Sequence, residues 1–409
     1  MPMQAGLKGL CVRHSKIEPD DRAEMVQMKI AYINTLGIPA RYGGFETCVE
    51  EISTRLVKRG HHVTVYGSCD STSRLRSYKG VNLTNVPRSS NKFLDFPLRS
   101  LVSTLYAVAR DFDIFHYYGA DSSVFTVIPR SLRRKIVISL DGLTFKGSSY
   151  PRLVRVVLRS TAWLPLYLPH AATVDSLHVR GWYQSTYGRA PVYVPYGANV
   201  SPRGANPDVL QRFGLDEDRY LLFVGRLVPE KGVHYLIEAF NDLVAKQGLQ
   251  LAIVGGNPYG SAYGLKLEKM AGNNVSFLGY VYGSDVDHLF KGSYLYVSAS
   301  ELEGTSPAIL SAMGFGNCVL ASDIPENVET LGDAGVTFRT RDPRDLRDKM
   351  LYLLQNPDVV QTYRKRAFER VSRFYSWDAV ADSMEQIYFS LATTNHERPF
   401  MTPNQRGKT

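Results

Sequence analysis

The feature that most constrains the fold is the segment from Tyr294 to Asn327, in which short apolar runs alternate with polar, glycine-containing turns. Leu295–Ser298 predicts a short buried strand, because its residues favour extended backbone. The chain then turns through residues 303–306, and Pro307 suits the first position of a helix, where its missing N–H costs nothing. Glycines end that helix before Cys318–Ala321, which predicts a second strand. The order of strand, turn, helix and strand indicates a βα unit of a parallel sheet.

The turn before that helix has the chemistry of a phosphate site. A strand–turn–helix directs unpaired backbone N–H groups and the positive end of the helix towards one point. Glu303 stands just before this point, where its carboxylate would repel phosphate but accept hydrogen bonds from sugar hydroxyls. The turn therefore predicts a phosphate site, with an ordinary βα unit that binds nothing as the alternative.

The same segment resembles the donor-binding segment of retaining glycosyltransferases of the GT-B fold, in glycosyltransferase family 4. That family shows the pattern EG-x-x-x-P-x-x-E-A-M-x-x-G. Pro307 lies one place early, Ser311 replaces the second glutamate, and the matching positions are Glu303, Gly304, Ala312, Met313 and Gly316. The resemblance implies that Glu303 is catalytic. It also implies that the donor is bound by Glu303, Gly304, Thr305, Ser306 and Ser311.

Length and composition favour a two-domain chain with anionic partners. At 409 residues and 44% hydrophobic content, the chain is long and apolar enough for two real cores. Its four cysteines lack metal-binding spacing, which favours a reducing compartment over a disulfide framework or a zinc site. No run approaches the ~18 apolar residues of a membrane span, and we expect no signal peptide at Met1. The balance of 48 basic against 39 acidic residues, +9, favours nucleotide diphosphates or acidic lipids, whereas nucleic acid is disfavoured because no recognition module occurs.

A first βα series opens the chain. Met28–Ile33 predicts a strand, residues 37–44 a glycine-rich turn, residues 45–56 a helix and His62–Tyr66 the next strand. The turn lacks G-x-G-x-x-G and is not a dinucleotide fingerprint, and paired glycines alone indicate only a turn. Its G-G-x-E form resembles the family loop that faces the donor diphosphate. The motif is formed by Gly43, Gly44 and Glu46. The resemblance implies that Gly43 and Gly44 bind the donor and that Glu46 lies on the acceptor side.

Two further predicted strands carry polar residues at or near their carboxyl ends. Ile114–Tyr118 contains His116, and Ile136–Leu140 is followed by Asp141. In doubly wound sheets ligands collect outside the carboxyl ends of strands, so these residues should face a cleft. The segment DGLTFK, which starts at Asp141, resembles a segment of family members that build bacterial surface polysaccharides, although many other members have histidine at this position. The resemblance implies a catalytic Asp141 and an acceptor-side His116, whereas a turn residue and a structural histidine are the alternatives.

A second βα series begins with the apolar strand Leu221–Val224. It is followed by G-R-L-x-x-E-K-G, in which Arg226 and Lys231 share one loop. Arginine offers a bidentate fork and lysine a point charge, so together they can neutralise a diphosphate leaving group. An isolated pair would be read as solvated cations, but the ordered neighbours of this motif resemble the family. The resemblance implies that Arg226 and Lys231 are catalytic and donor-binding, and that Tyr280 and Val281 contact the nucleotide base.

The resemblance covers about 29–392 and implies an α/β chain of the GT-B fold, with two Rossmann-like, doubly wound domains facing a cleft. We expect a flexible extension over residues 1–27, an acceptor-side domain over 28–205 and a nucleotide-sugar domain over 206–373. A helix over 374–392 should cross back to the first domain, and the polar tail 393–409 should be disordered.

The resemblance further implies a retaining hexosyltransferase that moves a sugar from a nucleotide diphosphate donor to a growing, lipid-linked glycan in surface polysaccharide synthesis. No D-x-D motif stands at a diphosphate position, so we expect no metal or other cofactor. Such an enzyme would act in the cytoplasm, at the inner face of the cell membrane. Two other classes stay open, a GT-B-type nucleotide-sugar epimerase and a catalytically silent binding subunit, the second because of Ser311 and Asp141.

Ser311 bears on the identity of the donor. The second glutamate of the family accepts hydrogen bonds from both ribose hydroxyls, whereas serine offers a single hydroxyl. A deoxyribose donor would lose least by the substitution, and the nearest resemblance is to rhamnosyltransferase-like members, whose donor is dTDP-rhamnose. We therefore consider dTDP-rhamnose a candidate donor, beside UDP-hexoses and GDP-mannose.

The segment from Tyr150 to Leu168 mixes arginines with apolar and aromatic residues, and more basic residues occupy 130–135. Basic residues beside anionic lipid contribute ~1 kcal/mol each. The segment predicts binding to an acidic membrane surface, with a core helix that carries solvated arginines as the alternative.

Overall fold

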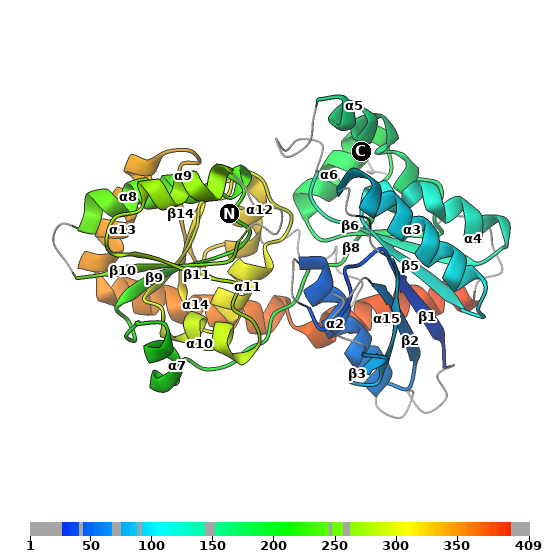
Figure 1. Ribbon diagram of the computed structural model, residues 1–409, viewed down its shortest axis with the longest axis horizontal. Helices are drawn as coiled ribbons and strands as arrows, with labels where there is room; N and C mark the ends of the chain where they lie inside the picture. Colours follow the sequence, from blue (N-terminus) through cyan, green and yellow to red (C-terminus); the bar gives the residue numbers. More distant parts are fainter. Residues whose placement is uncertain are drawn as a thin grey trace, which may run out of the picture. The chain divides into compact units, whose positions relative to one another are not determined.

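The computed structural model describes residues 27–40, 44–67, 75–87, 89, 92–143, 152–244, 248–256 and 262–393 (Figure 1). The predicted extension over 1–27, apart from its last residue, and the polar tail from 394 lie outside these residues, as does Gly43. The chain forms two compact units. The first holds Met1–Asp141, Val156–Pro195 and Trp377–Thr409, and the second holds Gly142–Arg155 and Tyr196–Ser376. Helix α5 (Arg152–Thr161) spans this division and is described below with the first unit, which holds most of it.

The first unit is built on an eight-stranded sheet of order β3-β4-β2-β1-β5-β6-β7-β8, in which every pair is parallel except β3 with β4. Its strands are β1 (Lys29–Ile33), β2 (His62–Gly67), β3 (Ser77–Tyr78), β4 (Val81–Asn85), β5 (Ile114–Tyr118), β6 (Lys135–Leu140), β7 (Ala171–Val174) and β8 (Val192–Tyr193). Its helices are α2 (Gly44–Lys58), α3 (Lys92–Val108), η2 (Ala120–Thr126), α4 (Val127–Ser131), α5 (Arg152–Thr161), η4 (Leu164–Leu166), α6 (Leu177–Tyr187) and α15 (Trp377–Thr393).

Helices cover both faces of this sheet. Helix α2 packs with α15, and α3 packs with η2 and α4 on the opposite face (Figure 1). The strands β5 and β6 between these layers are almost entirely buried, and their residues are mostly apolar or aromatic rather than alternating between apolar and polar.

The second unit is built on a fully parallel six-stranded sheet of order β11-β10-β9-β12-β13-β14. Its strands are β9 (Tyr220–Val224), β10 (Gln250–Val254), β11 (Val275–Gly279), β12 (Leu295–Ser298), β13 (Cys318–Ser322) and β14 (Val336–Phe338). Its helices are α7 (Pro207–Arg212), η5 (Pro229–Lys231), α8 (Val233–Val244), α9 (Ala262–Met270), α10 (Ser284–Gly292), α11 (Pro307–Gly314), α12 (Pro325–Leu331), α13 (Pro343–Gln355) and α14 (Pro357–Phe374). The segment from Tyr294 to Asn327 therefore contains β12, α11 and β13, as its pattern predicted.

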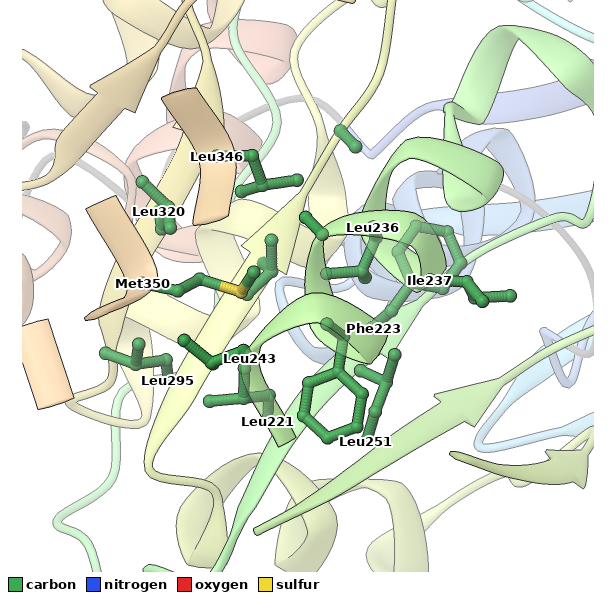
Figure 2. Packing of buried hydrophobic residues seen from close by; sticks show 14 of the residues in the cluster. Leu221, Phe223, Leu236, Ile237, Leu243, Leu251, Leu295, Leu320, Leu346 and Met350 are labelled. Atoms are coloured by element: carbon green, nitrogen blue, oxygen red, sulfur yellow. The ribbon is translucent and has the colours of Figure 1, made fainter. Parts of the chain in front are cut away.

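The core of this unit lies between its sheet and the layer formed by α8, α9 and α13 (Figure 1). Figure 2 shows how strand residues meet helix residues there, with Leu221 and Leu295 from the sheet, Leu236 from α8 and Met350 from α13. Each of these four side chains is completely buried. Burial of a leucine or methionine side chain contributes roughly 1.5–3 kcal/mol, so these contacts hold the helix layer against the sheet.

The strand order creates a switch point between β9 and β12. From β9 the chain moves outward through β10 to β11 at one edge, then returns to β12 on the other side of β9. At such a point the loops that leave neighbouring strands diverge, and ligands bind outside the carboxyl ends. The loops that carry Arg226, Lys231 and Glu303 all leave this edge.

The second unit begins earlier than the 206 expected from sequence. Ala198 N–H donates to the carbonyl oxygen of Tyr375 at 2.8 Å, and Ala198 forms a parallel bridge with Ser376. These contacts attach residues from Tyr196 onward to the end of α14. Among the described residues, no helix combines the length and the apolar character needed to cross a membrane.

Candidate functional site

Two residues assigned to the site from sequence meet at the switch point of the second unit. Lys231 ends the 3₁₀ turn η5 after β9, and Glu303 lies in the loop after β12. The Lys231 Nζ donates to Glu303 Oε1, and Ser300 Oγ donates to the same oxygen at 2.8 Å. Their side chains are only 17% and 10% exposed, so this cation and this carboxylate interact with little screening by water.

The turn that carries Lys231 is pressed against the end of β12. Gly232 has φ +63°, and a Cβ at this position would overlap the carbonyl oxygen of Ala299. Glu301 N–H donates to the carbonyl oxygen of Glu230 at 2.8 Å. The two loops are thus joined through their backbones as well as through the Lys231–Glu303 pair. Their close approach explains why the motif G-R-L-x-x-E-K-G ends in a glycine, Gly232.

Arg226 occupies the same edge of the sheet. It is exposed and lies just beyond β9, between two backbone hydrogen bonds that connect the β9 and β10 loops. In the first Gly225 N–H donates to the Val254 carbonyl at 3.0 Å, and in the second Leu227 N–H donates to the Gly256 carbonyl at 3.0 Å. These two hydrogen bonds hold the backbone on either side of Arg226, which is itself exposed.

Helix α11 points its amino terminus at this edge. Ser306 is its N-cap with extended backbone, Pro307 occupies the first position, and no acidic residue lies in the first turn. Thr305 and Ser306 are buried, and Gly304 connects them to Glu303. Backbone N–H groups at a helix start favour anions. Glu303, which pairs with Lys231, lies four residues before the first residue of this helix. Ser311 lies in the second turn of this helix and is half-buried.

An aromatic surface follows β11 at the same edge. The rings of Tyr280 and Tyr282 are almost parallel, with an interplanar angle of 4° and centroids 5.9 Å apart. They are 41% and 45% exposed, and Val281 between them is partly exposed. Gly256 leaves room for the Tyr280 ring, since a Cβ there would lie 2.9 Å from it. The surface offers flat faces against which a planar ring can stack.

His116 lies in the core of the first unit and not at a surface. Its Nδ1 is 2.6 Å from the Tyr388 hydroxyl and its Nε2 is 2.7 Å from the Ser139 hydroxyl, with the side chain fully buried. Burial lowers the pKa of His116 to about 3, so the ring is neutral at physiological pH. A buried ring with both nitrogens engaged cannot contact an acceptor, and this placement favours the structural histidine over the acceptor-side role.

The other residues assigned to the first unit lie near the ends of its strands. Gly44 begins α2, and Glu46 is buried with its Oε1 accepting a hydrogen bond from Leu36 N–H at 3.0 Å. This contact ties α2 to the loop after β1. Asp141 directly follows β6 and is partly exposed, whereas Gly43 lies outside the described residues.

A residue that the sequence pattern did not single out is Asp121, the second residue of η2, which follows β5. Burial, and secondarily the charge of Asp141, raises the pKa of Asp121 to about 7. The Asp121 carboxyl therefore holds its proton through mildly acidic pH, unlike an ordinary aspartate. The signal was present as polar residues after the predicted strand Ile114–Tyr118, at the end where ligands collect.

Known proteins share this architecture. Residues 42–201 match Glycosyltransferase Family 4, and residues 208–370 match Glycosyl transferases group 1. A phosphatidyl-myo-inositol mannosyltransferase from Mycolicibacterium smegmatis is 25% identical over 367 residues, 86% of this chain and 91% of that protein. A sucrose-phosphate synthase from Thermosynechococcus elongatus aligns with a TM-score of 0.74 at 20% identity, over 89% of this chain and 99% of that one. Anabaena HepE in complex with UDP-glucose aligns with a TM-score of 0.74 at 18% identity, over 89% and 100% of the two chains. The predicted α/β class and GT-B fold are confirmed.

Proposed function

We propose that this chain of GT-B fold, which matches both of these family models, is a retaining hexosyltransferase that extends a lipid-linked glycan from a nucleotide diphosphate sugar. The observation that carries this proposal is the Lys231–Glu303 pair beside the amino terminus of α11. The pair sets a cation for phosphate next to a carboxylate for sugar hydroxyls. A nucleotide diphosphate sugar presents both groups side by side.

The chemistry of the second unit is electrostatic. When the bond from the sugar to the diphosphate breaks, negative charge develops on the leaving oxygen. Lys231, Arg226 and the N–H groups at the start of α11 stabilise that charge, and preorganised donors of this kind are the largest single contribution in many enzymes. Glu303 orients the sugar by accepting hydrogen bonds from its hydroxyls.

The acceptor hydroxyl attacks on the face from which the diphosphate leaves, and the diphosphate oxygen takes its proton. The new glycosidic bond forms as the sugar–phosphate bond breaks, so the reaction needs no carboxylate nucleophile and, we propose, no metal. On the acceptor side, the partly exposed Asp141 would hold the incoming glycan, with Asp121 close to it in charge interaction.

The nucleotide base would stack near Tyr280 and Val281, beyond the end of β11. Ser311 lies in α11 where a ribose would follow the diphosphate, and its single hydroxyl leaves one of two ribose hydroxyls without a direct partner. A deoxyribose loses least, which supports dTDP-rhamnose as donor. HepE has been solved with UDP-glucose and the mycobacterial relative is named a mannosyltransferase, so UDP-hexoses and GDP-mannose are the competing donors.

A donor panel tests the function. The purified chain, mixed with dTDP-rhamnose, UDP-hexoses or GDP-mannose and a lipid-linked acceptor, should release nucleoside diphosphate only when the acceptor is present. Conversion of a free nucleotide sugar without acceptor would indicate an epimerase, and binding without turnover would indicate a silent subunit. In competition binding we expect dTDP to bind at least as tightly as UDP and GDP. Binding of UDP or GDP tenfold tighter than dTDP, ~1.4 kcal/mol, would exclude the deoxyribose argument.

We also propose that the first unit binds an acidic membrane surface through α5, which would bring the enzyme to a lipid-linked acceptor at the cytoplasmic face. None of the residues of α5 is buried, and Leu153, Val156 and Val157 are more than half exposed. A core helix would bury such residues, so this exposure argues against the core-helix alternative. The helix also carries Arg152, Arg155 and Arg159. Other exposed apolar residues occur elsewhere in this unit, in or beside α3, η2, α4 and η4, namely Leu98, Leu101, Leu105, Val124, Val127 and Trp163.

Vesicle co-sedimentation measures this binding. The chain should bind vesicles that contain acidic lipid, and replacement of Arg155 or Arg159 by Gln should weaken binding about fivefold each, ~1 kcal/mol, at low salt. Val157→Ser should weaken it by loss of apolar contact, whereas Leu265→Ser serves as the control because Leu265 is 61% exposed in α9 of the second unit. Binding that is indifferent to acidic lipid and to salt would rule the surface out.

A further inference from the structure

Glu301 lies two positions before Glu303, and its carboxylate contacts protein side chains from two other segments of the second unit. Its Oε1 accepts a hydrogen bond from the Tyr235 hydroxyl at 2.9 Å. Its Oε2 accepts from Arg341, whose Nε lies 2.8 Å away and whose Nη2 donates to the same oxygen. Both oxygens are therefore occupied by protein donors, and the Glu301 side chain is only 18% exposed.

The partners of Glu301 come from separate parts of the second unit. Tyr235 lies in the first turn of α8, just after the turn that carries Lys231. Arg341 follows β14 at the edge of the sheet, in a turn with φ +65°. That turn is itself held in place, because Thr340 N–H and Oγ1 both donate to Asp323 Oδ1, at 2.9 and 2.6 Å.

We infer that Glu301 and Arg341 are positioning residues that fix the distance between the Lys231 turn and the Glu303 loop. The backbone N–H of Glu301 holds the Lys231 turn by donating to the carbonyl of Glu230. The Glu301 side chain ties the Glu303 loop to α8 through Tyr235 and to the turn after β14 through Arg341. With both of its carboxylate oxygens engaged by protein donors, Glu301 acts as a brace between these elements. The expected loss of turnover rests on the proposed function, whereas the structural role of Glu301 and Arg341 does not depend on it.

The consequence follows from the geometry required for charge stabilisation. Lys231 and Glu303 act on adjacent groups of one donor, and a displacement of about 1 Å between catalytic groups can cost ~10²-fold in rate. Loss of the brace should lower kcat more than it raises KM, because the loops remain in place on average but are less well aligned in the transition state.

A double-mutant cycle with an independent structural readout tests the brace. Glu301→Gln and Arg341→Met should each lower kcat about tenfold. Because both substitutions remove the same Glu301–Arg341 interaction, the kcat of the double variant should lie within about twofold of that of the less active single variant. Arg341→Lys should recover activity to within about threefold of the wild type. Arg339→Met is the matched control, since Arg339 is a nearby exposed arginine that pairs with Asp342 and Asp345 instead.

Hydrogen exchange separates this inference from the proposed function. Amides of residues 226–232 and 300–306 should exchange faster in Glu301→Gln and Arg341→Met than in the wild type, with melting temperatures close to that of Arg339→Met. Unchanged exchange in both variants, or losses of kcat that multiply in the double variant, would overturn the brace. Failure of the wild type to use any nucleotide sugar would overturn the proposed function, while the exchange rates would still decide the brace.

Discussion

Replacement of Lys231 by alanine should lower turnover ~10²-fold or more, as expected when a charge contact to a leaving group is lost. The effect has two parts. On the proposed function, the variant lacks the cation that would stabilise the departing diphosphate. It also leaves the Glu303 carboxylate, now held only by Ser300 among the contacts described, beside the place proposed for that diphosphate. Repulsion between two anions in a poorly solvated place then adds to the lost attraction. Arg226→Ala should produce a loss of similar size without altering Glu303.

Steady-state kinetics with a saturating donor measures the effect. Lys269→Ala is the matched control, because Lys269 is an exposed lysine in the last turn of α9. Lys231→Ala combined with Glu303→Gln should recover some donor binding relative to Lys231→Ala alone, since the unpaired anion is gone. Near-normal turnover in both Lys231→Ala and Arg226→Ala would remove the assigned diphosphate site.

Gly232→Ala should lower both stability and turnover, whereas Gly214→Ala should lower stability only slightly. The two glycines have nearly the same left-handed backbone, φ +63° and +66°. A non-glycine residue in this region costs about 1 kcal/mol, so that term is common to both variants. At Gly214 no atom lies within 4 Å of an added Cβ, but at Gly232 the Cβ overlaps the Ala299 carbonyl oxygen.

The overlap cannot be relieved by a side-chain rotation, because the atom that is struck belongs to the backbone at the end of β12. Overpacking of this kind costs typically 1–3 kcal/mol, so we expect a total loss of about 2–4 kcal/mol in Gly232→Ala against about 1 kcal/mol in Gly214→Ala. The relaxed chain also moves Lys231 away from Glu303, which should reduce turnover ~10²-fold. Urea unfolding and kinetics on the same preparations measure both effects. Equal losses of stability in the two variants would contradict the close approach of the two loops.

The sequence alone was enough for the elements and for the position of two candidate residues in the fold. Apolar runs such as Leu221–Val224 and Leu295–Ser298 became buried strands of a parallel sheet, because a strand covered on both faces must be apolar along its length. The spacing of Arg226 and Lys231 within one loop placed both at the end of β9, since residues a few positions apart cannot separate far. Local pattern and short-range geometry account for these successes.

The interpretation of single residues in the middle of strands was less secure. His116 was assigned to the acceptor side because it stands near the end of a predicted strand, but its ring points into the core and contacts Tyr388, 272 positions away. The side chains of a strand alternate between the two faces of the sheet. The sequence of β5 does not indicate which of its faces α15, the helix that carries Tyr388, will cover. The interaction of Asp121 with Asp141 could not be predicted from sequence either, because it depends on β5 and β6 being neighbours in the sheet.

What the sequence determined by itself is therefore what adjacent residues decide: the βα order, the strands that must be buried, and the cations that share a loop with glycine. Tertiary structure alone decided which distant groups meet. It brought Lys231 to Glu303 across 72 positions and Arg341 to Glu301 across 40. Such contacts depend on strand order and on the packing of whole elements, and these are set by the total burial of the core rather than by any local pattern.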